Sequence, residues 1–195
     1  MKKVLLLLFI CLSIILIGCN SNASKYGEDL QSVSDEILET ASGVEDMLNQ
    51  YSSVWSFSIQ SRGAITVSDM MTQTGLDEDS ITEYFQINSA GNIPDDFSTN
   101  VHSLNSYFEG TGQIEEMKNS SDDIKSKVSD LNNAPSDYEK AYDELLDMHS
   151  YFEEFIEMAL NPKGNITSFN EDKNRIASDI LSQHKRIETI MPSEN

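Results

Sequence analysis

Three histidines are the residues of this chain best suited to hold a metal ion or to move a proton: His102, His149 and His184. Di-iron sites in helical bundles use a glutamate three residues before a histidine, and no histidine here has one. His149 and Glu153 are four residues apart, so on a helix they share a face and could hold a metal ion or line a catalytic cleft. Histidines on acidic helices are more often surface or boundary residues. We therefore expect no metal site and no cofactor, with the His149–Glu153 pair as the alternative.

Carboxylates are the most abundant titratable groups, and several are adjacent in sequence, such as Asp95–Asp96 and Asp122–Asp123. General acid–base catalysis needs two carboxyl groups in different environments that face one cleft, whereas adjacent residues of a helix point in different directions. The chain contains no G-x-S-x-G, no P-loop, no H-E-x-x-H and no dinucleotide-binding fingerprint. We predict a protein that is not an enzyme, although a serine triad assembled only in space would leave no such motif.

The net charge limits the class of partner. The 195 residues include 33 acidic and 13 basic side chains, which gives a formal charge of −20. Such a surface repels phosphate backbones, so we expect no nucleic acid as a partner. The length suits one domain, and a hydrophobic content of 38% is enough to build its core.

Aromatic residues supply the one candidate ligand or partner surface. Tyr51 and Trp55 are one helical turn apart, and Tyr84 and Phe85 lie in a later segment that could fold over them. Together they could line a pocket, although packing in the core explains the same pattern. The segment 161–165 is explained by a turn between two helices, built on a proline and a glycine.

The first residues have the pattern of a secretory signal. Lys2 and Lys3 precede an apolar run over residues 4–17, which is shorter than the roughly 20 residues that span a membrane. The run ends in Leu16-Ile17-Gly18-Cys19, which resembles the lipobox of bacterial lipoproteins, the motif of a type II signal peptide. The resemblance covers this leader alone, and the rest of the chain resembles no family that we recognise.

The resemblance implies a division of the chain and a location. Residues 1–18 would be the signal peptide, and Cys19 would become the first mature residue, with a diacylglyceryl group on its sulfur and acyl chains such as palmitate. Residues 19–25 would form a polar tether and residues 26–192 the ectodomain. Cys11 would leave with the signal peptide, so the mature chain would have no free thiol. The expected location is the extracytoplasmic face of a cell membrane, and the Asn, Ile and Ser content favours a Gram-positive envelope.

Apolar residues recur every three or four positions over most of the chain, which predicts amphipathic helices. The expected long helices cover residues 26–61, 97–131, 136–160 and 168–191. Gly110 and Gly112 leave open whether the second is continuous or interrupted, with an interruption favoured. Packing such helices antiparallel predicts an all-α, up-and-down bundle of about four long helices, joined by an irregular connection at 63–96. A short helix near residues 77–86 is expected within that connection.

These features favour a membrane-anchored binding or interaction module without catalytic activity. Its partner would be an envelope protein, a peptide or a small apolar ligand. The alternative is an immunity or superinfection-exclusion lipoprotein that obstructs a toxin or phage at the membrane, a function that small anchored helical domains suit by analogy. The third possibility is an enzyme with its cleft at His149 and Glu153.

Overall fold

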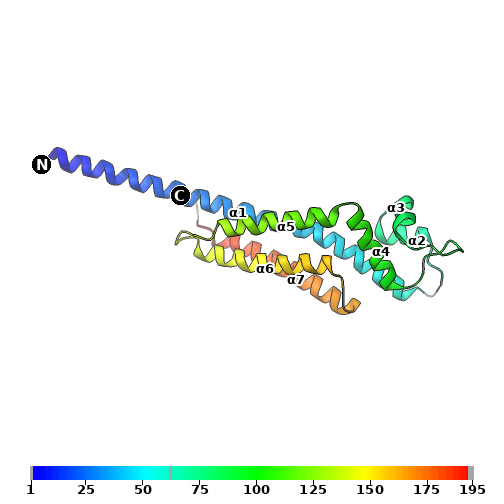
Figure 1. Cartoon of the computed structure of the whole chain (residues 1–195). Coiled ribbons are helices and arrows are strands. Elements are labelled where there is room, and N and C mark those ends of the chain that lie inside the picture. Colours follow the sequence, from blue (N-terminus) through cyan, green and yellow to red (C-terminus); the bar gives the residue numbers. More distant parts are fainter. Residues whose placement is uncertain (1, 62, 193–195) are drawn as a thin grey trace.

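The computed structural model describes residues 2–61 and 63–192, with side chains from Asn22 onward except that of residue 62. Within these residues the chain is all-helical, as predicted, and contains no strand. The helices are α1 (Lys2–Gln60), α2 (Val67–Thr74), α3 (Glu78–Tyr84), α4 (Phe97–Gly110), α5 (Gln113–Asp130), α6 (Glu139–Leu160) and α7 (Ile166–Ile190). Figure 1 shows them as an elongated bundle.

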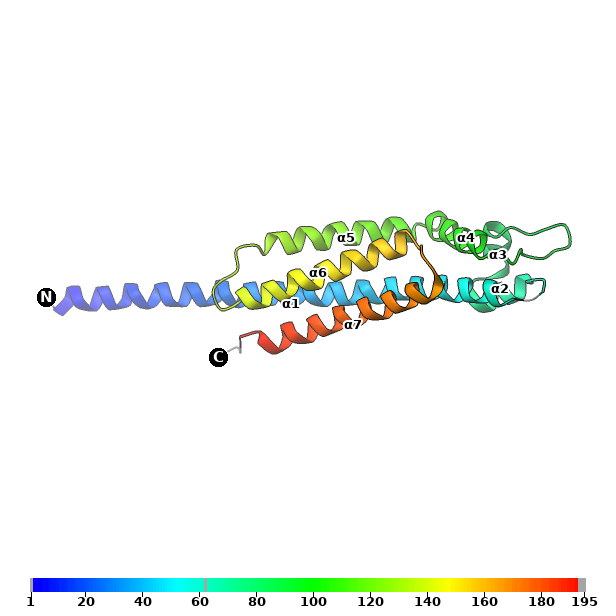
Figure 2. The same cartoon turned by 90° about the horizontal axis from the view of Figure 1, so that it is seen from below.

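Helix α1 is the axis of the bundle, because it contacts α4, α5, α6 and α7. Helices α4 and α5 run antiparallel to it: the Tyr51 hydroxyl donates to Asn105 Oδ1 at one end, and Lys127 pairs with Glu36 toward the other. Figure 2 places α2, α3 and α4 at the end of the molecule farthest from both termini.

Helices α6 and α7 form an antiparallel pair along the rest of α1. Arg175 Nη2 lies 2.8 Å from Glu154 Oε1, and Arg186 Nη2 lies 2.6 Å from Glu144 Oε1, so residue numbers rise on one helix as they fall on its neighbour. The short turn between Leu160 and Ile166 makes this arrangement necessary.

The apolar stripe expected on the first helix is confirmed. Every residue of the stripe is buried, and the list is Leu30, Val33, Ile37, Ala41, Val44, Leu48, Tyr51 and Trp55. These side chains meet stripes of α4 to α7 in one continuous core. Because a single amphipathic helix cannot cover its own apolar face, this shared burial holds the helices together.

The long helix expected over residues 97–131 is two helices. Helix α4 ends at Gly110, and Gly112 has a φ of +82°, a left-handed conformation that glycine adopts without a steric penalty. The chain then resumes the same direction as α5. The described residues therefore contain five long helices, and the predicted count of about four is not confirmed.

The connection at 63–96 is more regular than expected. It contains α2 and α3, and its two ends meet in an isolated antiparallel bridge between Ile65 and Ile93. Asp77 caps α3, because its side chain accepts a hydrogen bond from the backbone of Ser80. Five apolar side chains of this segment join the main core: Ile65, Met70, Ile81, Phe85 and Ile93. The connection is thus part of the domain.

Residues 22–25 are the part of the predicted polar tether (19–25) whose side chains are described. They lie within α1, where Lys25 pairs with Asp29 one turn later. Cys19 and the rest of the lipobox precede Asn22 and lie outside the residues whose side chains are described. No helix of the described part of the chain has an apolar stretch long enough to cross a membrane.

Candidate functional site

The four aromatic residues of the predicted surface lie largely inside the protein. Tyr51 is completely buried, with its ring edge-on to Phe108, and Phe85 is buried as well. Tyr84 is half-buried and its ring meets that of Tyr107. Burial raises the pKa of the Tyr51 hydroxyl. Core packing, the alternative that the sequence left open, describes the environment of these three residues.

Trp55 differs from Tyr51, Tyr84 and Phe85 because it also lines a groove at the surface. Its ring is stacked on Phe97, with the ring centres 5.4 Å apart and the planes 5° from parallel. On another side it packs against Phe169 of α7. Trp55 is 4% exposed and Phe97 is 40% exposed, so the outer ring of the stack is presented to solvent on a rigid support.

We call this cavity the distal groove. Its walls are Trp55 on α1, the first three turns of α4, and the loop between α6 and α7. Its volume is about 490 Å³, within the range of sites for small molecules. The lining residues are Trp55, Phe97, Ser98, Val101, His102, Asn105, Leu160, Asn161, Pro162, Lys163 and Gly164.

The charge of the distal groove is unlike that of the rest of the molecule. None of the described residues that line it is acidic, and Lys163 and His102 are exposed there. Two carboxylates nearby are engaged by asparagines of the lining: Asn105 donates to Glu109, and Asn161 donates to Glu157. In a chain of net charge −20, the lining of the groove therefore carries no negative charge of its own.

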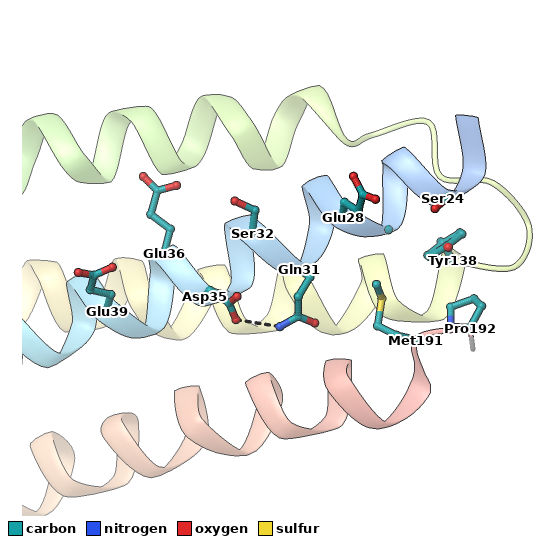
Figure 3. A pocket seen from close by; sticks show the side chains of 11 residues that line it. Ser24, Glu28, Gln31, Ser32, Asp35, Glu36, Glu39, Tyr138, Met191 and Pro192 are labelled. Atoms are coloured by element: carbon teal, nitrogen blue, oxygen red, sulfur yellow. Dashed lines mark hydrogen bonds between the residues drawn. The ribbon is translucent and has the colours of Figure 1, made fainter. Parts of the chain in front are cut away.

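A larger groove at the opposite end is strongly acidic. It has a volume of about 610 Å³ and is lined by one face of α1, by Tyr138 and by the end of the chain at Met191 and Pro192. Figure 3 shows its carboxylates along α1, with Gln31 donating to Asp35. The acidic groove combines these carboxylates with apolar surface from Tyr138, Met191 and Pro192, and Lys127 of α5 already pairs with its Glu36.

His149 and Glu153 lie on one face of α6 as expected, but they do not form a close pair. The distance from His149 Nε2 to Glu153 Oε1 is 3.9 Å, and Lys125 binds the same carboxylate oxygen at 3.0 Å. His149 is nearly buried, and this burial lowers its pKa. In the described part of the chain, no three His, Cys, Asp or Glu side chains are placed to hold a metal ion.

Sequence reasoning missed one arrangement that has the chemistry of a serine triad. Ser34 Oγ lies 3.0 Å from His184 Nδ1, and His184 Nε2 lies 3.7 Å from Glu188 Oε1. Ser34 is completely buried, beside the Met148 sulfur at 3.4 Å. A substrate carbonyl cannot reach this hydroxyl without opening the core. The contact joins α1 to α7, and no motif could have revealed it because the partners are 150 residues apart.

Comparisons with protein families, with curated proteins and with solved structures found no match to this chain. The leader and the geometry of the two grooves are therefore the features that bear on function.

Proposed function

We propose that this protein is a lipid-anchored, extracytoplasmic lipoprotein that binds its partner in the distal groove and catalyses no reaction. In this proposal Cys19 carries the lipid and the helices form a rigid support above the membrane. Helices α4 and α5 act as one interrupted helix, which makes the support an up-and-down bundle of four long elements. The envelope is expected to be Gram-positive, and the partner to be an envelope protein, a peptide or a small apolar ligand.

The observation that carries the proposal is the exposed Phe97 ring stacked on Trp55 in a groove without acidic residues. Solvent-exposed aromatic rings in a concave site are typical of ligand-binding surfaces. The rigid position of the stack supports this interpretation, because a preorganised site loses little conformational entropy on binding. Within the described residues, no hydroxyl or thiol of the groove is hydrogen-bonded to a base that would activate it.

The length of α1 supports the proposed geometry. A continuous helix from Asn22 to Trp55 spans about 50 Å, at 1.5 Å per residue. An anchor immediately before Asn22 would therefore hold the distal groove far from the lipid, at the end where Figure 2 shows α4. This arrangement suits capture of a partner away from the membrane surface. The acidic groove would lie near the lipid headgroups.

Photo-crosslinking in the native membrane tests the proposal. A photoreactive amino acid at Ser98, an exposed residue of the distal groove, is compared with the same amino acid at Lys140, exposed at the other end of the bundle. Intact-mass spectrometry should find a defined adduct from position 98 in the membrane fraction and none from position 140. The same adducts from both positions, or none from position 98, would contradict the distal groove as the binding site.

A further inference from the structure

We infer that the distal groove binds an aromatic carboxylate, with the ligand's ring on Phe97 and its carboxylate at Lys163. This inference rests on the proposed function and adds the chemical class of the ligand. Two kinds of molecule present this chemistry: a free small aromatic acid, and the C-terminal aromatic residue of a peptide.

Phe97 presents part of its ring to solvent in the distal groove. Trp55 occupies one face of Phe97, and Phe97 is nonetheless 40% exposed. Phe97 is the first residue of α4, and its backbone is fixed because Asp96 caps the helix by accepting a hydrogen bond from Thr99. A planar ring placed on the exposed side would extend an existing stack of two rings, an arrangement that aromatic groups favour.

Lys163 supplies a positive charge to the groove. Among the described residues it forms no ion pair, like Lys118, Lys140, Lys173 and Lys185, but of these lysines only Lys163 lines the distal groove. Lys163 lies in the turn between Leu160 and Ile166, and Gly164 after it has a left-handed φ of +98°, which holds the turn in a defined shape. An exposed ammonium group in a groove whose lining has no acidic residue is a binding point for a carboxylate.

The lining suits a cationic ligand less well than an anionic one. A cation would be attracted to the face of an aromatic ring, but the described lining offers no carboxylate to neutralise it. The acidic residues closest in sequence to the lining asparagines, Glu109 and Glu157, already accept hydrogen bonds from Asn105 and Asn161. The lining itself therefore adds no like charge against an anion, whereas the neighbouring hollow that Lys163 also lines contains Glu154, Glu157 and Asp172.

The molecule contains its own reporter for a test. Trp55 is the only tryptophan of the chain, so its fluorescence, excited selectively beside tyrosine and phenylalanine, reports on the distal groove. The full-length protein in detergent is titrated with 3-phenylpropionate and with the peptide Gly-Gly-Phe. The matched controls are the amides of both molecules, which retain the ring and lose the charge, and hexanoate, which retains the charge and loses the ring.

We expect a saturable change in fluorescence with at least one acid, and affinity about tenfold weaker for its amide and for hexanoate. Binding of both acids would show that the carboxylate and ring suffice. Binding of the peptide alone would identify a peptide C-terminus as the source.

The Lys163 variants test the role of the charge. Lys163→Gln should lower the affinity for the acid to that of the amide, and Lys163→Arg should preserve the affinity for the acid. Lys140→Gln, an exposed lysine at the other end of the bundle, should change nothing.

Two results would overturn the inference. The first is equal affinity for acid and amide, or an affinity for the acid that Lys163→Gln leaves unchanged. The second is no response to either acid in protein that still gives the crosslinked adduct from position 98; the proposed function would then stand and the ligand class would be wrong. Because Lys163 is exposed, its substitution leaves the fold intact, which circular dichroism verifies.

Discussion

A hydrogen bond between Ser34 on α1 and His184 on α7 crosses the bundle core, with 3.0 Å between Ser34 Oγ and His184 Nδ1. Both residues are buried, so neither has water as a replacement partner. We predict that Ser34→Ala lowers the free energy of unfolding by about 1 to 3 kcal/mol, the range for a buried polar group that loses its partner. Urea denaturation measures this change. Ser32→Ala, an exposed serine of the same helix, should be close to neutral; an equal loss from both would contradict a specific role for the hydrogen bond.

Two glycines of α1 should respond oppositely to alanine. A Cβ at Gly43 would meet no atom within 4 Å, so Gly43→Ala should raise the free energy of unfolding by about 1 kcal/mol through helix propensity. A Cβ at Gly27 would lie 2.7 Å from the Tyr138 hydroxyl oxygen, and Tyr138 is itself packed against Tyr26. Gly27→Ala should therefore lower stability by about 1 kcal/mol or more, because overpacking outweighs the gain in propensity. Thermal unfolding of both variants distinguishes these outcomes. Stabilisation by Gly27→Ala would show that α6 does not pack here as described.

The buried position of His149 should make stability depend on pH. Burial lowers the pKa of His149 below its ordinary value of 6.5; Glu153 acts to raise that pKa and Lys125 to lower it. The unfolded chain therefore binds this proton at a higher pH than the folded chain does. The part of the free energy of unfolding that comes from burying His149 in its neutral form is fully present above pH 6.5. It is lost as the pH falls below 6.5, by at most about 1.4 kcal/mol per pH unit.

His149→Leu should remove that part of the pH dependence. Between pH 7.5 and 5 the variant should lose less stability than the wild-type protein, as measured by urea denaturation at each pH. His102→Leu is the control, because it removes an exposed histidine and leaves the buried one. Parallel pH profiles for the wild-type protein and His149→Leu would contradict the prediction.

Arg186 and Glu144 should contribute more than the other surface ion pairs. Glu144 is 17% exposed, and its second carboxylate oxygen is buried without a hydrogen-bond partner in the described residues. Removing the guanidinium by Arg186→Met should therefore cost about 1 kcal/mol, reduced at high salt. Lys25→Met breaks an exposed pair with Asp29 and should have no measurable effect. Equal effects of the two substitutions would show that the partial burial of Glu144 has no energetic consequence.

The helices and the core were predictable because both depend on a repeating pattern. The stripe from Leu30 to Trp55 repeats over enough residues that its helical period is recognisable even where a single position is ambiguous. All members of the stripe are buried. Helix starts were less predictable, since a cap depends on one local hydrogen bond. The sequence Ser136-Asp137-Tyr138-Glu139 has the form of a capping box, yet α6 begins at Glu139 without a side-chain cap. Helix α7 begins earlier than expected, because Asn165 caps it.

The candidate site was predictable only in part. Trp55 is predictable from the sequence as part of a surface, but the sequence indicates only that Phe97 begins a helix. The tertiary structure alone shows that the Phe97 ring remains exposed and stacked on Trp55. The turn around Lys163 was explained as a turn alone, because nothing local indicates which surface it faces. The Ser34–His184 contact joins positions that no periodic pattern relates. Sites assembled from distant segments are thus the part of the molecule that a sequence does not reveal.

The intact mass of the full-length gene product, extracted in detergent from its own membrane, decides whether the protein is anchored by lipid. We predict a chain that begins at Cys19 and carries the added mass of a diacylglyceryl group, and we predict that Cys19→Ser abolishes both the processing and the added mass. A chain that retains Met1, or a processed chain without lipid on Cys19, would show that the protein is not a lipid-anchored module.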